Sequence, residues 1–522
     1  MFETLSDSMK KIARGSAIAI AGLFGGLLLQ FISRIFIARY GSEADYGIFS
    51  LALVVLNFAM ILACLGLQEG ATRYIAYFRG RGKGEVTKVR VTVAVSLQLA
   101  AAASIIISIA LFFSANYIAS NIFHSPDLAQ ALKVFAIGLP FFTLINILVA
   151  IFRGFDRVEP QAFFQFVLLN ILFLFLLLAI ILFGLPFIAV FYAYLISLVV
   201  IFIALVAYTF KKLPQPVTFT NRLASSGTFR RELLFFSLPL LGITILTMTV
   251  LSMDTLLLGY FKMPEIVGLY NGAYPLAYFI SVPIYALFLI YTPVATGLYS
   301  QSLMAELKRS YIISTKWIVS LTLPIFLVLC LFPEAVLNLF FGPAYVAAAP
   351  ALRILSLGFI INNLFGPNQS ILLAMGESGF IMWASLAAAM INILLDIVLI
   401  PPLDIVGAAI ASASSVVITK LIISIKAYLL CQAQPLSKNL LKPIAVSIVL
   451  ALLLKFATPG LVSITWWMLV LLFILYYAIY AIAVVVTRSF DREDIALLLE
   501  IEKMSGVNAA PIKKLLERFI RL

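Results

Sequence analysis

The chain has 522 residues, of which 63% are hydrophobic and only 11% are charged, and its mean hydropathy is +1.11. A soluble globular protein carries roughly 25% charged residues, so these values exclude a water-soluble particle and a disordered chain. The net charge of +13 comes without a basic stretch interleaved with stacking aromatics, which argues against a nucleic-acid partner. We expect an all-α polytopic membrane protein.

Fourteen apolar stretches, most of them about 20 residues long, predict about fourteen transmembrane helices. The first is too long for the apolar region of a cleavable signal peptide, and the thirteenth is short. The stretches lie at 15–38, 46–67, 91–113, 132–152, 162–183, 187–210, 233–258, 266–292, 311–332, 351–374, 380–400, 405–430, 442–457 and 462–487.

Most of the 36 Lys and Arg residues fall in connectors on one side of this arrangement. Lys316, Lys420 and Lys426 are assigned to these inner connectors. The positive-inside rule then places both termini in the cytoplasm, in a multi-pass protein of the cell (plasma) membrane. The outer connectors, such as 401–404, are short, and no exterior domain is expected.

The two halves of the sequence resemble each other at an offset of about 220 residues. Gly47–Ser50 matches Gly268–Asn271, and Ala131–Val134 matches Ala351–Ile354. The repeat covers six spans, and an even number preserves orientation, so the halves are predicted to be parallel repeats. The predicted domains are an N-lobe (1–210, spans 1–6), a cytoplasmic linker (211–232), a C-lobe (233–430, spans 7–12), spans 13–14 (431–487) and a cytoplasmic amphipathic tail (488–522).

Ionisable residues inside spans are functional candidates, because burying a charge in a membrane is costly. Arg34 in span one and Asp254 in span seven occupy equivalent positions in the two repeats. We hypothesise that they face each other across an outer cleft, where Arg34 attracts an anionic head group and Asp254 pairs with Arg34 when the outside is closed. The alternative is that each side chain snorkels to the interface or bonds within its own lobe.

Other polar residues are weaker candidates for the cleft. Lys133 and Arg353 correspond in the two repeats, and snorkelling accounts for them as well as ligand contact does. Asp396, in the middle of span eleven, is either an H⁺ or Na⁺ coupling site or a neutral structural residue. Further amides line the cleft or bond between helices: Gln30, Asn57, Gln165, Asn170 and Asn392.

The inner end of span two carries Glu69 and Arg73, which are four residues apart and form a favourable helical pair. We assign them to a cytoplasmic gate. Glu43-x-Asp45 resembles the acidic motifs of membrane glycosyltransferases, but its loop is too short to build a catalytic site, and we do not expect an enzyme. The single His124 and three scattered cysteines predict neither a metal site nor a cofactor.

Three longer motifs resemble one protein family: Arg39–Gly47 after span one, Leu65–Ala76 after span two, and Asp254–Tyr260 with Val267–Tyr270. They are similar to polysaccharide biosynthesis proteins, the Wzx-type oligosaccharide flippases of the multidrug/oligosaccharidyl-lipid/polysaccharide (MOP) exporter superfamily. The resemblance implies two six-helix lobes plus two C-terminal helices, with alternating access. It also implies transfer of a polyprenyl-(pyro)phosphate-linked oligosaccharide to the outer leaflet for cell-surface polysaccharide or glycoprotein glycan assembly.

In this family cationic cleft residues bind the anionic part of the substrate, and Arg34 is the best match, with Arg39 at the rim. The implied partners are the lipid-linked oligosaccharide, membrane lipids, and glycosyltransferases or a polymerase of the same pathway. Three alternatives share the fold class. They are a MATE-type cation-coupled drug antiporter, a peptidoglycan lipid-precursor flippase, and a non-transporting scaffold of a glycan-assembly complex.

Overall fold

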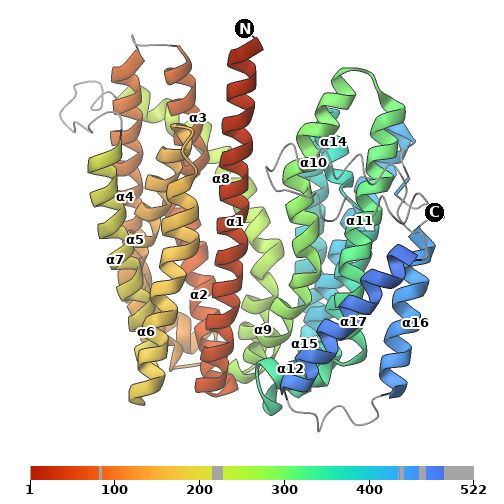
Figure 1. Ribbon diagram of the computed structural model, residues 1–522. Helices are drawn as coiled ribbons and strands as arrows, with labels where there is room; N and C mark the ends of the chain where they lie inside the picture. The colour runs from red at the N-terminus through yellow and green to blue at the C-terminus, as the bar shows by residue number, and fades with distance from the viewer. Residues whose placement is uncertain are drawn as a thin grey trace. The chain divides into compact units, whose positions relative to one another are not determined.

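The computed structural model describes residues 2–81, 85–213, 227–432, 434–435, 440–457 and 466–486 (Figure 1). Within these ranges the chain is helical and forms no strand. It divides into two compact units, Met1–Gly268 and Leu269–Leu522. The predicted tail (488–522) and most of the predicted linker (214–226) lie outside the described residues.

The N-terminal unit is a bundle in which α5 lies at the centre and packs against α2, α3, α4 and α7. Two of its elements, η2 and η3, are π-helices. Its helices are α1 (Phe2–Tyr40), α2 (Glu43–Cys64), α3 (Leu67–Gly80), α4 (Val86–Tyr117), η2 (Ile118–Ile122), α5 (Leu128–Gly154), η3 (Gln161–Leu168), α6 (Leu169–Phe183), α7 (Ile188–Lys212), α8 (Gly227–Phe261) and the start of α9 (Pro264–Tyr278).

In the C-terminal unit, α13 packs between α11 and α15, and α10 packs against α11 and α14. Two short 3₁₀ segments, η4 and η5, interrupt the helical path. After α9 the elements are η4 (Phe279–Ser281), α10 (Val282–Ser300), α11 (Met304–Leu331), α12 (Pro333–Phe340), η5 (Pro343–Ala348), α13 (Ala349–Leu364), α14 (Asn368–Ala374), α15 (Ser378–Cys431), α16 (Leu441–Ala457) and α17 (Trp466–Val486).

Ten helices in the described ranges are long and apolar enough to cross a membrane, and two further apolar helices are shorter. Every predicted apolar stretch falls on one or more of the observed helices. Predicted spans eleven and twelve are both part of α15, which contains one non-helical residue, Asp404 (φ 52°, ψ −131°), in the predicted connector 401–404. The prediction of an all-α polytopic membrane protein is confirmed.

The assignment of Lys316, Lys420 and Lys426 to inner connectors is wrong. Lys316 lies twelve residues into α11 with 4% of its surface exposed, and the other two lie inside α15. All three lysines fall within the predicted spans 311–332 and 405–430, so the apolar stretches placed them better than the charge rule did. Lys426 is paired there with Glu377 at 3.5 Å.

The acidic motif after span one has a structural role at the start of α2. The Ser42 hydroxyl accepts a hydrogen bond from the Asp45 backbone N–H at 3.1 Å, and Asp45 Oδ2 accepts one from the Ser42 N–H at 2.9 Å. This reciprocal capping box satisfies backbone donors that a helix start leaves open. Capping of α2 therefore explains the presence of an aspartate at position 45 without any catalytic role.

Glycines allow α8 and the start of α9 to lie directly against α2 and α3. A Cβ atom at Gly47 would lie 1.8 Å from the carbonyl oxygen of Pro264, and one at Gly268 would lie 2.0 Å from that of Glu43. At the other end, a Cβ at Gly70 would lie 2.1 Å from the Ser237 hydroxyl. Side chains at these positions would push the helices apart. This packing joins α8 to the N-terminal unit, whereas the predicted lobes divide at 211–232; that lobe boundary stays a prediction.

Candidate functional site

A polar cavity of about 230 Å³ lies inside the N-terminal unit. Its walls come from α1, α2, α5, η3, α6 and α7, and apolar side chains make up most of the lining. A water-filled or ligand-filled space is the setting in which polar groups of a membrane protein are tolerated. The polar lining residues are Gln30, Ser33, Arg34, Asn57, Gln165, Asn170 and Tyr194.

Arg34 supplies the positive charge of this cavity. Its guanidinium donates a hydrogen bond to the hydroxyl oxygen of Tyr46, which is also hydrogen-bonded to Ser50 in the same helix, α2. Tyr194 lies close enough to interact with the Arg34 charge. The residues that line the cavity beside Arg34 contribute hydroxyl and amide dipoles.

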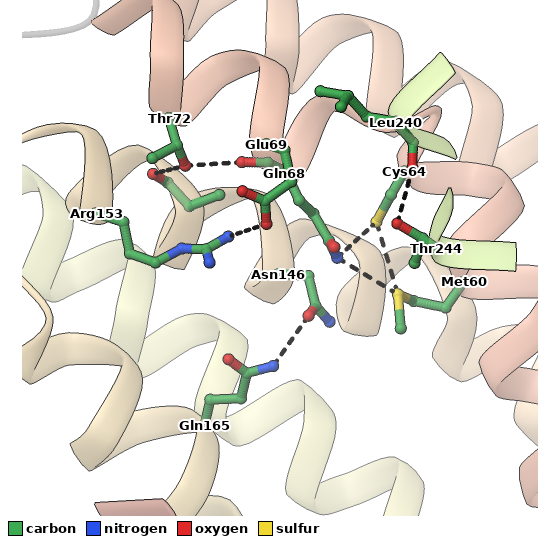
Figure 2. Close-up of polar contacts among 11 residues, drawn as sticks. Met60, Cys64, Gln68, Glu69, Thr72, Asn146, Arg153, Gln165, Leu240 and Thr244 are labelled. Carbon is green, nitrogen blue, oxygen red and sulfur yellow. Dashed lines mark hydrogen bonds and ion pairs between the residues drawn. The ribbon is translucent and has the colours of Figure 1, made fainter. Parts of the chain in front are cut away.

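Amide side chains surround this charge, and their NH₂ groups are bonded within the protein. Asn57 donates to the carbonyl oxygen of Leu53 at 2.8 Å, and Asn170 donates to that of Phe166 at 2.7 Å. Figure 2 shows Gln165 donating to the amide oxygen of Asn146 at 2.9 Å. The cavity therefore combines one cation with several oriented amides and no carboxylate in its lining.

Aromatic rings form a large part of the apolar wall. Phe49 of α2 stacks in parallel with Phe173 of α6, with ring centroids 6.3 Å apart, and Phe173 meets Tyr194 edge to face at 5.2 Å. Such ring contacts are worth ~0.5–1.5 kcal/mol beyond the area they bury. They hold three lining helices in a fixed register around Arg34.

The structure brings five predicted cleft residues together in this cavity: Gln30, Arg34, Asn57, Gln165 and Asn170. They meet inside one unit, whereas the sequence suggested a groove between two lobes. Asp254, the predicted partner of Arg34, is buried in α8 with 1% of its surface exposed, and its pairing with Arg34 stays a prediction.

The other predicted site residues lie elsewhere. Arg353 is paired with Glu334 at 2.7 Å in the C-terminal unit. Arg39 is exposed in the last turn of α1, and Lys133 is half-buried in α5. Asn392 and Asp396 are fully buried one turn apart in α15.

The predicted gate residues Glu69 and Arg73 have separate partners rather than each other. Glu69 pairs with Arg153 of α5 at 3.2 Å (Figure 2), and the Arg73 guanidinium lies 4.1 Å from the ring centre of Phe236 in α8. Beside them, the Tyr74 hydroxyl donates to Glu232 at 3.1 Å. These contacts bind α3 to α5 and α8.

Sequence reasoning missed Tyr46 and Tyr194 as members of the site. Tyr46 follows the first span as part of a helix start, and only the close approach of α1 and α2 brings its hydroxyl to Arg34. The π-helix η3, which carries Gln165, was also not expected. A polar residue in an otherwise apolar run was the only signal for it.

Comparison with solved structures identifies the class of fold. The chain is similar to the lipid II flippase MurJ in its inward closed conformation, with a TM-score of 0.67 and 15% identity, covering 88% of this chain and 97% of that one. It is also similar to an inward-facing multidrug resistance MATE family transporter of the MOP superfamily, with a TM-score of 0.64 and 18% identity, covering 81% and 98%. The protein therefore has the fold of the MOP transporters.

The family is identified by sequence. Residues 12–295, more than half of the chain, match the model of the family described as polysaccharide biosynthesis protein, and the chain belongs to that family. It is 28% identical over 129 residues to the teichuronic acid biosynthesis protein TuaB of Bacillus subtilis (strain 168). That match covers 24% of this chain and 26% of the relative's length. The family resemblance seen in the motifs is confirmed.

Proposed function

We propose that this protein is a flippase, and not an enzyme, that transfers a polyprenyl-(pyro)phosphate-linked oligosaccharide from the cytoplasmic to the outer leaflet of the plasma membrane. The product serves cell-surface polysaccharide or glycoprotein glycan assembly. Transfer proceeds by alternating access, as the fold of the MOP transporters suggests. The basic connectors support cytoplasmic termini. Glycosyltransferases or a polymerase of the same pathway are the proposed partners.

The observation that carries this proposal is Arg34 in a polar cavity of the N-terminal unit whose lining includes no carboxylate. A phosphate and its sugars cannot cross hydrocarbon unaided, while a polyprenyl tail stays in the bilayer throughout. A guanidinium offers several donors in a fixed fork that matches phosphate oxygens. The cavity therefore provides the charge and polar surface that the membrane lacks.

The lining of the cavity favours an anionic ligand over a cationic drug. A cation antiporter needs a carboxylate at its site, and the residues that line this cavity include none. The peptidoglycan-precursor flippase remains the second candidate, since its cargo carries the same lipid pyrophosphate chemistry, and the similarity of fold to MurJ favours it. The substrate panel of the test separates the two.

Coupling to an ion gradient would reside in the C-terminal unit. Asp396 and Asn392 are buried one helical turn apart in α15, and their oxygens are suited to H⁺ or Na⁺. We propose Asp396 as the coupling residue. An imposed pH or Na⁺ gradient that changes the initial flipping rate of the wild-type protein but not of Asp396→Asn would support this role.

The test is leaflet exchange in proteoliposomes. Purified protein is reconstituted with a labelled polyprenyl-pyrophosphate oligosaccharide or with lipid II, and head groups on the outside are removed by an added glycosidase or pyrophosphatase. We expect transfer of the oligosaccharide lipid by the wild type. In Arg34→Gln, loss of a charge-assisted contact worth ~1.5–3 kcal/mol reduces the rate roughly ten- to hundredfold.

The control is Lys88→Gln, which also removes one positive charge. Lys88 is exposed in α4, where it pairs with Glu85 at 2.9 Å and lies 5.5 Å from the Phe78 ring centre, outside the cavity, so wild-type transfer is expected. No transfer of any lipid-linked glycan by the wild type would reject the proposal. Transfer of lipid II alone would select the second candidate.

A further inference from the structure

The amide groups of the cavity have acceptor oxygens to offer a ligand. Asn57 and Asn170 each use their NH₂ group on a carbonyl oxygen one turn earlier, and Gln165 uses its own on Asn146 (Figure 2). Gln165 Oε1 is buried and has no hydrogen-bond partner among the described residues. Buried acceptors without a donor are costly, so they favour a ligand that brings hydroxyl groups.

The position of Gln165 is set by an unusual backbone. It lies in the π-helix Gln161–Leu168, and π-helical turns occur frequently at functional sites. The glycines of α1 fit closely against this segment, because a Cβ at Gly26 would lie 2.8 Å from the carbonyl oxygen of Phe166. Asn146 of α5 holds the other side of the Gln165 amide. Gln165 is therefore fixed before any ligand arrives.

The size of the cavity limits what fits beside Arg34. At ~30 Å³ per water molecule, the volume of about 230 Å³ corresponds to roughly seven or eight waters. That space is enough for one sugar ring. The aromatic wall of Phe49, Phe173 and Tyr194 offers an apolar surface for the C–H face of such a ring.

We propose that this cavity is a subsite that reads one anionic sugar unit, in which Arg34 binds the negative group and Gln165, Asn57 and Asn170 accept hydrogen bonds from ring hydroxyls. Gln165 is its specificity-determining residue. The ligand class is a glycosyl phosphate. This inference rests on the proposed function, whose cargo contains such a unit.

The experiment measures binding of soluble hexose 1-phosphates, and of analogues that each lack one hydroxyl, to the full-length protein in nanodiscs by calorimetry. The wild type should bind at least one hexose 1-phosphate roughly tenfold more tightly than one of its deoxy analogues, because a missing hydroxyl leaves a buried acceptor unpaired. Gln165→Leu should abolish that preference and retain affinity for the phosphate.

Gln68→Leu is the matched control, since Gln68 contacts the sulfurs of Cys64 and Met60 outside the cavity (Figure 2) and should keep the preference.

Asn57→Ala provides a second variant, on α2 rather than η3, should Gln165→Leu not fold. It should abolish the preference at a different hydroxyl. Equal binding of all deoxy analogues by the wild type, or an unchanged preference in both variants, would overturn the inference. If the wild type flips a lipid-linked glycan but shows neither effect, only the subsite is wrong. Selective binding of the soluble sugars without flipping of any lipid would instead contradict the proposed function and support the subsite.

Discussion

The orientation of the Arg34 side chain depends on its hydrogen bond to Tyr46. A free arginine side chain has many rotamers, and a hydrogen bond to the Tyr46 hydroxyl selects among them. Ser50 in turn fixes the Tyr46 hydroxyl from within α2. Tyr46 is thus a positioning residue that acts through Arg34 rather than by touching the ligand.

Tyr46→Phe removes the acceptor and leaves the ring in place. We expect affinity for a hexose 1-phosphate to fall about three- to tenfold, or ~0.7–1.4 kcal/mol, because the guanidinium loses orientation. Calorimetry on both single variants and on Tyr46→Phe combined with Arg34→Gln measures this coupling. The tyrosine substitution should have no further effect when Arg34 is absent. An equal loss in both backgrounds would show that Tyr46 acts only on stability.

At this scale the sequence predicts residue types better than partners. Arg34, Asn57 and Gln165 could be chosen because polar groups within apolar spans are rare and costly. The partner of Glu69 could not be predicted. The sequence shows the four-residue spacing from Glu69 to Arg73, but Arg153 comes near Glu69 only because α5 packs on α3. Contacts between helices depend on tertiary packing, which cannot be read from a single amino-acid sequence.

Helix α3 is joined to α8 by a contact that has no room for side chains. A Cβ at Gly66 would lie 2.1 Å from the Ser237 carbonyl oxygen, and Gly70 is equally close to the Ser237 hydroxyl. The Arg73–Phe236 and Tyr74–Glu232 contacts continue this line along α3. Together they fasten one end of α8 to the N-terminal unit.

Gly70→Val tests this contact. The branched side chain forces the two helices apart, and such overpacking costs about 1–3 kcal/mol, so we expect a lower thermal unfolding midpoint in detergent. Gly80→Val, at the end of the same helix, is the matched control because a Cβ there meets nothing within 4 Å. Equal midpoints for the two variants would show that the close contact of α3 and α8 does not stabilise the protein.

Apolar length predicts where helices form, but not where they change type. The run from Gln161 to Phe183 looks uniform in hydropathy, yet its first eight residues are a π-helix. The break at Asp404 is easier to anticipate, because Pro401 and Pro402 precede it. The π-turn has no comparable signal in its own run; what the structure shows is a close approach to the glycines of α1.

At the scale of the whole molecule, the two compact units defined by packing do not have the same boundary as the two halves of the sequence repeat. The repeat assigns α8 to the second half of the sequence, but α8 packs against α2 and α3 in the unit Met1–Gly268. Gly47 and Gly268, which correspond in the repeat, contact each other's helices reciprocally. Such reciprocity is typical of elements related by a two-fold axis.

Cutting the chain between α7 and α8 should therefore not separate the pieces. With a protease site inserted within 214–226, we expect both fragments to elute together in mild detergent after complete cleavage. The buried contacts of α8 with α2 and α3 hold them. Size-exclusion chromatography followed by denaturing gels measures this. Independent elution of the N-terminal fragment would mean that the covalent link, rather than α8, maintains the unit.

Every helix that lines the Arg34 cavity belongs to the N-terminal unit. In the proposed function, a cargo bound there would keep its contacts with this one unit while the rest of the protein changes conformation. Choice of cargo and movement of the carrier then become separable traits. If the proposed subsite holds, substitutions in these lining helices would change the preferred sugar without touching the C-terminal unit.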